Sequence, residues 1–574
     1  MKARQPLLFT EMPHRSPELQ IAIDRAGTAS AEERGAIFTQ PEVVDRILDI
    51  ADYTVQRDLA RMRLLEPAFG QGDFLIAAIS RLMNSFIAHG GNLHTCAGTL
   101  AQSICGIEVN KDDFLIAQKR IFSLLLTFDI CENDAHSLVD GWLKQDDFLL
   151  TDITGQFEFV IGNPPYVRQE RIPATLLQQY RSRYQTMYNR ADLYIPFFER
   201  GLTLLIAGGT LVFICSDRWL TNKYGGPLRA FIDVRFYLHS YVRMHESKAF
   251  KQNVSAYPAI VAIKEGTASA SLPLTNPDFS GELPKDSCSL LPDAIVARPF
   301  ESVSYKQPLT HPWLAALTKD QQSLLQRLEN DFPTLEAVGG KVGIGVATGC
   351  DSLYIDDIDR LPVEDACKLP LIMTADIRSG DIQWSGKGII NPFTATGKLV
   401  SLVDYPLLER YLMEHEAKIR SRHVAQKNPH AWYRTIDRIY PDLLAQPKLL
   451  LPDIALQPTV VYDEGCYYPH HNLYYIIAPT WDLRVLQALL SSHIARFFIA
   501  AYSTRIRGGY LRFQAQYLRR IRIPNYATIS SHMRSDLIHA AMARDFVTIN
   551  ALASNVYQLN ASENVTLSMY PTRS

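Results

Sequence analysis

Hydrophobic and polar positions change their period repeatedly along the first half of the chain. Short apolar runs such as 63–67 (RLLEP), 103–109 (SICGIEV) and 157–163 (FEFVIGN) are typical of buried strands. Longer segments between them repeat apolar residues every three or four positions, as in 73–87 (DFLIAAISRLMNSFI) and 112–128 (DDFLIAQKRIFSLLLTF), which predicts helices. Strands that alternate with helices in this way predict an α/β domain with a largely parallel sheet.

The second half of the chain has a less regular pattern. A segment rich in Ser, Pro, Gly and Asp, 265–293, predicts a linker or a long surface excursion. Beyond it we expect a mixed α+β module, with a helical stretch near 476–500 and a terminal helix from about 533 to 559. The chain is therefore divided into an N-terminal extension (1–34), the α/β domain (35–264), a linker (265–300), a second module (301–530) and a C-terminal helix and tail (531–574).

Composition narrows the class of protein. A chain of 574 residues that is 47% hydrophobic can bury more than one core. The 58 basic and 60 acidic residues nearly balance, so any basic surface for nucleic acid must be local. The eight cysteines form no CxxC pair, which favours a reducing compartment. Residues 1–17 lack a signal-peptide core, and the longest apolar stretch, 202–215, is too short to cross a bilayer, so we expect a cytoplasmic protein without a membrane.

An acidic residue and a glycine turn lie between the first predicted strand and the next helix. In 64–75 (LLEPAFGQGDFL), Glu66 is followed by Gly70 and Gly72. Glycines let the backbone approach a ligand closely, and an acid at the end of a strand can accept from an ammonium or a hydroxyl group. The third glycine of a dinucleotide fingerprint is missing, and no P-loop lysine follows. A tight structural turn explains this stretch equally well.

Two further acids follow at the ends of apolar runs. Glu108 is placed as the acid that takes both ribose hydroxyls in α/β nucleotide-binding units. Asp147 can accept from an exocyclic amine, while the adjacent Phe148 covers a purine ring. Taken singly, each residue is explained better without a ligand. Glu108 would be a solvated acid at a strand end, Asp147 a loop acid and Phe148 a core side chain.

The stretch 163–166, Asn-Pro-Pro-Tyr, favours a functional interpretation of these residues over a structural one. The amino group of adenine is a poor nucleophile, because its lone pair is delocalised into the ring. Fixed acceptors, here the Asn163 side chain and the Pro164 carbonyl, would draw its protons out of plane, and the two prolines, Pro164 and Pro165, fix φ so that the carbonyl is aimed beforehand. Tyr166 offers a ring face to an extruded base. A strand that ends in a rigid turn is the alternative, but the acids and glycines upstream favour chemistry.

Together these motifs resemble those of the TaqI-type, gamma-order DNA adenine-N6 methyltransferases of restriction-modification systems, which use S-adenosylmethionine. EPAFGQG (66–72) is similar to the family's Asp-Pro-Ala-Cys-Gly-Ser-Gly, with Glu66 in place of the first Asp. GAIFTQPEVVDRIL (35–48) resembles its N-terminal motif, with Thr39 matched although Gln40 is interposed before the proline. KAFKQNVSAYPAIVAI (248–263) resembles its last catalytic motif, where Phe250 matches the aromatic residue beside the flipped base.

The resemblance implies a fold, a cofactor and a set of site residues. The fold is a Rossmann-like class I methyltransferase domain followed by a mixed α+β target-recognition domain, and the cofactor is S-adenosylmethionine. The rings of Tyr166 and Phe250 would sandwich one adenine. The implied catalytic residues are Asn163, Pro164, Pro165, Tyr166 and Phe250, and the implied cofactor-binding residues are Thr39, Glu66, Pro67, Ala68, Gly70, Gly72, Glu108, Val109, Asp147, Phe148 and Asn163.

The second half resembles the family more loosely, at 341–355, 447–454 and 505–524. The last of these carries six arginines among three aromatic residues and no acid, which suits contacts with phosphates, with an ordinary solvated face as the alternative. We expect duplex DNA as partner, and the resemblance also suggests a cognate restriction endonuclease or defence complex. The arginines expected to contact DNA are Arg168, Arg171, Arg505, Arg507, Arg512 and Arg519.

Other chemistries fit less well. Cys466, His470 and His471 match no zinc spacing, and neighbours on a strand point to opposite faces, so no metal is expected. Only 34 residues precede the methylase motifs, too few for a nuclease domain. Cytosine C5 methylation would need a cysteine beside a proline, and none lies near residues 163–166.

Three alternatives stay open beside DNA adenine methylation. RNA adenine and protein glutamine methyltransferases use the same Asn-Pro-Pro-Tyr chemistry, because each presents a planar amino group. Those enzymes carry a small N-terminal recognition part, whereas roughly half of this chain follows the catalytic half. A silent DNA-specificity subunit is a third possibility, against which the intact acids and tetrapeptide argue. The sequence does not reveal the DNA site itself.

Overall fold

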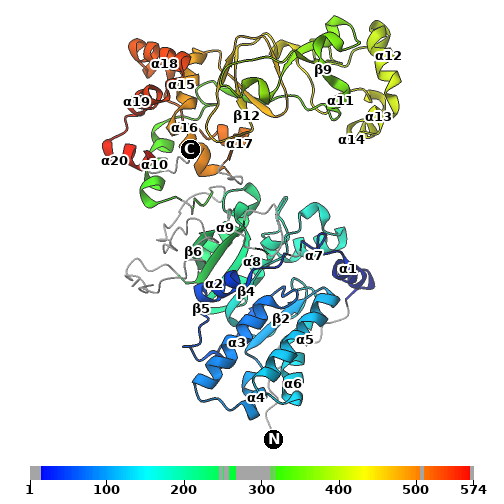
Figure 1. Cartoon of the computed structure of the whole chain (residues 1–574), viewed down its shortest axis with the longest axis vertical. Coiled ribbons are helices and arrows are strands. Elements are labelled where there is room, and N and C mark those ends of the chain that lie inside the picture. Colours follow the sequence, from blue (N-terminus) through cyan, green and yellow to red (C-terminus); the bar gives the residue numbers. More distant parts are fainter. Residues whose placement is uncertain are drawn as a thin grey trace. The chain divides into compact units, whose positions relative to one another are not determined.

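The chain folds into two units, Met1–Ala316 and Leu317–Ser574. The computed structural model, drawn in Figure 1, describes residues 15–35, 37–244, 250, 258–266, 312–314, 317–503 and 510–568. Most of the predicted linker (265–300) lies outside these residues, as do residues 1–14 of the predicted extension and 569–574 of the tail.

A seven-stranded sheet forms the centre of the first unit, with strand order β3-β2-β1-β4-β5-β7-β6. Strands β3, β2, β1, β4 and β5 pair in parallel, and β7 runs antiparallel to both β5 and β6. The prediction of an α/β domain with a largely parallel sheet is therefore confirmed. The strands are β1 (Leu64–Glu66), β2 (Ile104–Glu108), β3 (Leu143–Gln145), β4 (Phe157–Gly162), β5 (Leu205–Ser216), β6 (Phe236–Arg243) and β7 (Pro258–Glu265).

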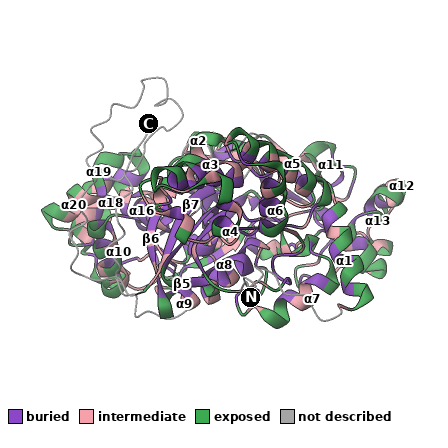
Figure 2. Ribbon diagram, turned by 90° about the horizontal axis from the view of Figure 1, so that it is seen from below, coloured by how far each residue is buried: buried purple, intermediate pink, exposed green. Residues whose placement is uncertain are grey.

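Helices cover both faces of this sheet. Along β5, Leu211 and Phe213 enter the core under one set of helices, and Val212 and Ile214 enter the core under the other. Figure 2 shows strands such as β5 and β7 in the colour of buried residues. One face carries α2 (Pro41–Ile50), α3 (Asp73–Ala88), α4 (Cys96–Leu100), α5 (Lys111–Thr127) and α6 (Glu132–Trp142), and the other carries α1 (Pro17–Thr28), α7 (Ala174–Arg183), α8 (Tyr194–Thr203) and α9 (Gly226–Arg235).

The order of the strands fixes where a ligand can bind. Strand order reverses between β1 and β4, whose carboxyl ends lie side by side because the two strands are parallel. In open α/β sheets, ligands bind in the crevice at such a reversal. Glu66 ends β1, Glu108 ends β2, and Asn163 directly follows β4. The sheet thus brings three predicted site residues to one edge.

The second unit is built from smaller sheets. Two of these have four strands each, in the orders β15-β10-β11-β9 and β14-β12-β16-β8, and β13 pairs with β17. The predicted mixed α+β module is confirmed. Its strands are β8 (Lys341–Ile344), β9 (Ile355–Asp357), β10 (Lys368–Ile372), β11 (Lys387–Ile390), β12 (Lys448–Pro452), β13 (Ile454–Ala455), β14 (Val461–Asp463), β15 (Tyr468–Pro469), β16 (Leu473–Ile477) and β17 (Leu511–Arg512).

Two helical stretches predicted for this unit are confirmed, but each is broken into two helices. The stretch near 476–500 contains the end of β16 and then two helices, because Ser492 ends one and caps the next through its hydroxyl. The terminal helix breaks at Arg544, whose φ of +56° is left-handed, and Asp545 caps the following helix. The helices are α10 (Lys319–Asp331), α11 (Asp351–Tyr354), α12 (Pro406–Glu414), α13 (Glu416–Arg420), α14 (His423–Lys427), α15 (Leu483–Ser491), α16 (His493–Tyr502), α17 (Ala515–Leu518), α18 (Ser531–Ala543), α19 (Phe546–Val556) and α20 (Ala561–Ser568).

No single helix within the described ranges has both the length and the apolar composition to cross a membrane. Helices α15 and α16 reach that composition only as a pair, and they bend by 60° where they meet.

The second unit contains a fully buried ion pair. Lys448 is fully buried, and its Nζ lies 2.7 Å from Oδ2 of Asp463, itself 1% exposed. The same ammonium group donates to the carbonyls of Leu443, Leu444 and Gln446. A buried ion pair is tolerated when its remaining donors are also satisfied, as they are here.

Candidate active site

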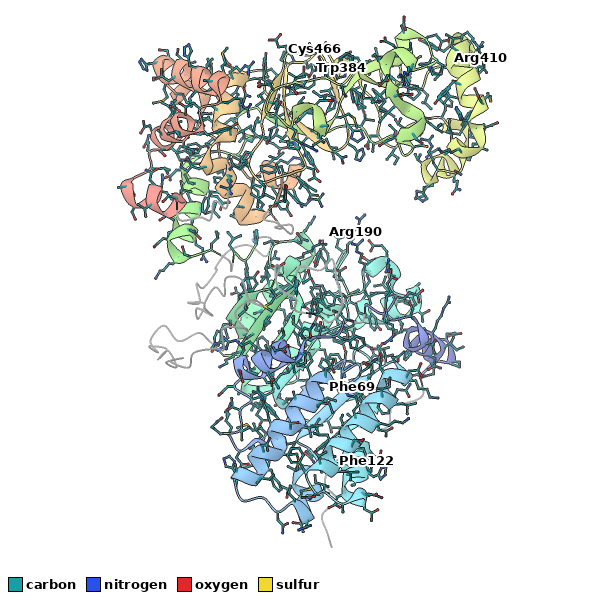
Figure 3. All side chains as sticks on the ribbon, in the orientation of Figure 1. Phe69, Phe122, Arg190, Trp384, Arg410 and Cys466 are labelled. Carbon is teal, nitrogen blue, oxygen red and sulfur yellow. The ribbon has the colours of Figure 1, made fainter. Side chains whose placement is uncertain are left out.

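The turn after β1 needs glycine at two positions. Gly70 (φ +53°) and Gly72 (φ +86°) both have left-handed backbone, which other residues adopt only with strain. A Cβ on Gly72 would lie 3.1 Å from the Cβ of Ala117 in α5. Phe69, labelled in Figure 3, packs beside Phe114 of the same helix, with ring centroids 5.9 Å apart. The turn is therefore held close to α5 and exposes backbone at the strand end.

Glu66 is a buried carboxylate with an unused acceptor. The residue is 1% exposed, and its Oε2 has no hydrogen-bond partner among the described residues. Burial raises the pKa of this carboxyl well above its usual range, and the negative charges of Asp73 and Glu108 add to the effect. Pro67 is buried and Ala68 is half-buried as the chain passes from Glu66 into the glycine turn. An ammonium group bound here would relieve an otherwise costly charge.

Glu108 is fixed by the backbone at both of its oxygens. Oε2 accepts from the backbone N–H of Gly70 at 2.7 Å, and Oε1 accepts from that of Asn110 at 2.8 Å. Burial raises the pKa of Glu108, although these two hydrogen bonds oppose the rise. Each oxygen keeps a second lone pair, so the carboxylate can still accept from hydroxyls. The adjacent Val109 is half-buried against α1, where a Cβ on Gly27 would lie 2.6 Å from the Val109 carbonyl oxygen.

Asp147 is held by α7, the helix that follows the Asn-Pro-Pro-Tyr stretch. Its Oδ2 accepts from the Tyr180 hydroxyl at 2.5 Å, and its Oδ1 accepts from the backbone N–H of Leu149 at 2.8 Å. Burial raises the pKa of Asp147, and both hydrogen bonds oppose this. Phe148 is 2% exposed and packs 5.0 Å from the ring of Phe197. Its ring is a core side chain, the alternative interpretation of the sequence, so its position gives no support to a role as purine cover.

Asn163 has one end of its amide fixed and the other unused. Its Nδ2 donates to the Ile37 carbonyl at 2.8 Å and lies 3.3 Å from Oγ1 of Thr39. Both donors are thereby directed at the N-terminal motif. Its Oδ1 is buried and has no partner in the part of the chain that the structure describes. The N-terminal motif thus orients the amide and leaves the oxygen available as an acceptor, next to the buried Pro164 and the half-buried Pro165.

The structure brings Tyr166 and Phe250 together, but not as parallel plates. Their ring centroids are 6.2 Å apart, and the ring planes are at 80°. The predicted sandwich of an adenine is therefore not present in this arrangement, and stacking on both rings would require one ring to turn. Phe250 forms an isolated bridge with Thr39, and Nε2 of Gln40 donates to its carbonyl at 3.3 Å. The interposed Gln40 thus helps to hold Phe250.

Sequence reasoning missed Gly35 and Arg15, which contact the chain near the carboxyl ends of the parallel strands. A Cβ on Gly35 (φ +61°) would lie 2.5 Å from the carbonyl carbon of Tyr166, so only glycine fits there. Arg15, before α1, pairs with Asp146 through two hydrogen bonds of 2.6 and 2.9 Å, next to Asp147. The signal was present as a serine, a proline and then a 3.6-residue apolar period at 16–28, which is a capped helix.

S-adenosylmethionine, the cofactor that the sequence resemblance implies, fits the buried acids of this site. The residues that would hold S-adenosylmethionine are Glu66 for its ammonium group and Glu108 for its ribose hydroxyls. The unpartnered Glu66 oxygen carries this fit, since the described ion pairs give that buried charge no cation. The glycines at 70 and 72 have no side chains, so the turn at the end of β1 can pass close to Phe38 and Ala117.

The predicted DNA contacts divide into two groups. Arg168 and Arg171, just after Tyr166, are exposed. Arg512 instead pairs with Asp453, and Nε of Arg519 lies 2.8 Å from Oε1 of Glu336. Phe513 and Tyr517, expected among surface arginines, are buried, so 510–524 is largely structural. Arg505 and Arg507 lie outside the described residues.

The expectation that His470 and His471 point to opposite faces of a strand was wrong. His471 lies in the turn after β15 and not on the strand, and the two imidazole centroids are 4.0 Å apart. Both rings approach Asp351, which lies 119 residues away in the sequence from His470.

Models of known protein families match segments in both halves of the chain. The family model described as Eco57I restriction-modification methylase matches residues 101–250. The model described as TaqI-like C-terminal specificity domain matches residues 370–523. These two matches lie in the first and second unit respectively.

Two relatives match nearly the whole chain. The type II methyltransferase M.PaeR7I of Pseudomonas aeruginosa is 49% identical over 539 residues, which cover 93% of this chain and 94% of that protein. M.XhoI of Xanthomonas vasicola is 46% identical and covers 93% and 98%. Among solved structures, the type IIL restriction-modification enzyme MmeI in complex with DNA has a TM-score of 0.57 at 11% identity, covering 96% of this chain and 75% of that one, which shows a shared fold.

Proposed function

Because the chain belongs to the S-adenosylmethionine-dependent type II methyltransferases, we propose that it methylates N6 of an adenine within a short duplex DNA site. The second unit, which matches a specificity-domain family, would select the site. The modification would protect host DNA in a restriction-modification system.

One observation carries the choice of an amino group as the methyl acceptor. The Asn163 Oδ1 is a buried acceptor with no partner within the described ranges, while its Nδ2 is fixed by Ile37 and Thr39. A buried amide oxygen without a donor costs free energy, and an entering N–H restores the missing hydrogen bond. An exocyclic amine brings two such hydrogens.

The reaction follows from these positions. The target base leaves the duplex, since its amino group cannot reach a buried acceptor while paired. Asn163 Oδ1 and the Pro164 carbonyl accept the two amino hydrogens, which frees the nitrogen lone pair. When bound, S-adenosylmethionine supplies an electrophilic methyl group. Asn163 would then hold the amine in line while its nitrogen bonds to the methyl carbon. The electron pair of the broken sulfur–carbon bond would stay on sulfur, so that a thioether leaves, and the excess proton would pass to water.

The test measures which nucleoside receives the methyl group. The full chain is incubated with plasmid DNA and S-adenosylmethionine labelled in its methyl group, and the DNA is digested to nucleosides. We expect labelled N6-methyladenine. Parallel reactions with RNA and with glutamine-bearing peptides should stay unlabelled, and label in cytosine or only in those reactions would contradict the proposal.

The variant Asn163→Ala tests whether the side-chain amide acts in the reaction. Removing one positioned group that stabilises the transition state costs about a hundredfold to a thousandfold in rate. We expect that loss in the labelling assay, with cofactor binding monitored separately by calorimetry. Asn84→Ala is the matched control, because Asn84 is an exposed amide on α3 of the same unit. Equal rates for the two variants would remove Asn163 from the mechanism.

A further inference from the structure

A group of metal-ligating side chains in the second unit lies apart from the proposed active-site residues. One ligand atom from each of Asp351, His470 and His471 lies within 4.8 Å of the others. The Nε2 of His470 is 3.2 Å from Oδ2 of Asp351. From this arrangement we propose a site for one divalent transition-metal ion of the zinc type, bound by these three side chains.

A hydrogen bond between Asp351 and His470 would not account for the whole group. The ring of His471 is held beside that of His470 with centroids 4.0 Å apart. His470 is 3% exposed, and the Nδ1 atoms of both rings are buried with no hydrogen-bond partner among the described side chains. A buried imidazole nitrogen without a partner is costly, and coordination of an ion through Nδ1 of His471 is one way to satisfy that atom. At His470 the coordinating atom would be Nε2, which faces Asp351.

The spacing agrees with coordination of one ion. Zinc binds imidazole nitrogen at about 2.0–2.1 Å and carboxylate oxygen at about 2.0–2.2 Å, so tetrahedral ligand atoms lie about 3.3 Å apart. The Nε2 to Oδ2 distance of 3.2 Å is close to that value. Two nitrogens and one oxygen leave a fourth position for water, and imidazole ligands favour zinc, copper or nickel over magnesium.

The surrounding chain holds each ligand in place. The Thr348 hydroxyl donates to Oδ1 of Asp351 at 2.5 Å, which leaves Oδ2 to face the histidines. The backbone N–H of His470 donates to the Ile372 carbonyl at 3.1 Å. A Cβ on Gly345 would lie 2.2 Å from the His470 carbonyl oxygen, so the chain can approach this turn only with glycine there. Such support orients first ligands and raises metal affinity.

The ion would act as a cross-link within the second unit. Asp351 begins α11, and the histidines lie between β15 and β16, which belong to two different sheets. An ion bound to all three would tie these parts together in the folded state only. Binding should therefore raise the thermal midpoint of unfolding.

The experiment uses the untagged full chain after treatment with a chelator. Calorimetric titration with Zn²⁺ should give one tight site per chain, and Co²⁺ at that site should show visible d–d absorption bands. His471→Ala and Asp351→Asn should each weaken Zn²⁺ binding at this site by about tenfold or more. Circular dichroism checks that the variants remain folded.

Asp536→Asn is the matched control. Nδ1 of His532 lies 2.8 Å from Oδ2 of Asp536 in an exposed pair on α18. This variant removes an aspartate–histidine pair of the same unit that has no third ligand, and Zn²⁺ binding should be unchanged. The absence of a stoichiometric site, unchanged affinity in folded His471→Ala, or a preference for Mg²⁺ over Zn²⁺ would each overturn the proposal.

Discussion

A buried ion pair of the second unit contrasts with three buried carboxylates of the first unit. In the second unit, Lys448 meets Asp463 and three carbonyls, so this ammonium group and this carboxylate both find partners away from water. In the first unit, Glu66, Glu108 and Asp147 are buried at the carboxyl edge of the sheet, and none of the described ion pairs includes them.

This difference distinguishes buried charges that stabilise the fold from buried charges that are available to a ligand. A paired buried charge holds a fold together, whereas an unpaired one lowers stability until a ligand arrives. The raised pKa values of Glu66, Glu108 and Asp147 follow from that second situation.

Breaking the pair in the second unit should have the largest effect on stability. Lys448→Met leaves Asp463 buried without a cation, and we expect the free energy of unfolding to fall by about 3–5 kcal/mol. Denaturant unfolding followed by circular dichroism measures it. Lys387→Met is the control, because it removes the cation of a solvent-accessible pair with Asp357, for which the loss of stability should be much smaller. Similar losses in both variants would place Lys448 among ordinary surface charges.

Glu66→Gln should move stability and ligand binding in opposite directions. Above the raised pKa of Glu66, the variant no longer buries a charge, so the free protein should become more stable. Cofactor affinity measured by calorimetry should fall by about tenfold to a hundredfold, because a charge-assisted hydrogen bond to the ammonium is lost. The exposed Glu132 on α6 provides Glu132→Gln as the control. A variant that loses stability and keeps its affinity would make Glu66 structural.

The pH dependence of stability and of cofactor affinity in the wild-type protein also tests the role of Glu66. Since the pKa of Glu66 is raised in the folded protein, its protonated form stabilises the fold at low pH, and this stability is lost as pH rises through that pKa. If the Glu66 carboxylate receives the ammonium group of the cofactor, affinity should rise over the same interval, up to about pH 8, where an α-amino group loses its charge. Calorimetry across pH tests this, and a rise of equal size in Glu66→Gln would assign it to another group.

Tyr180→Phe should have the smallest effect. Its hydroxyl donates to Asp147, which favours the ionised carboxylate, so the variant should raise the pKa of Asp147 further. We expect cofactor affinity to fall by about threefold to tenfold at neutral pH, with less loss at higher pH. Tyr188→Phe, at an exposed position after the same helix, is the control. An affinity loss that does not change with pH would mean that Tyr180 only packs.

Much of the first unit could be predicted because its geometry is repetitive. Apolar runs gave the strands, and parallel pairing then had to bring the residues after β1, β2 and β4 to one edge. Glu66, Glu108 and Asn163 meet there for that reason. The perpendicular rings of Tyr166 and Phe250 depend on packing that no local pattern contains.

The second unit could not be predicted to the same depth, because its charges pair across the chain. The stretch 510–524 contains no acid, yet Asp453 and Glu336 reach two of its arginines from far away in the sequence. Its strands are two to five residues long, too short for a period to show which face is buried. The contact of His470 with Asp351 belongs to the same kind of long-range information.

The position of β7 has a consequence for synthesis on the ribosome. This strand is last in sequence among the seven, yet it lies between β5 and β6. Until residues 258–265 emerge, β6 has no neighbour and β5 has an open edge, while the strands carrying Glu66, Glu108 and Asn163 can already pair. Phe250, which precedes β7, is seated with the closing of the sheet. A nascent chain would therefore complete its acidic edge first and gain its second aromatic ring only with the final strand.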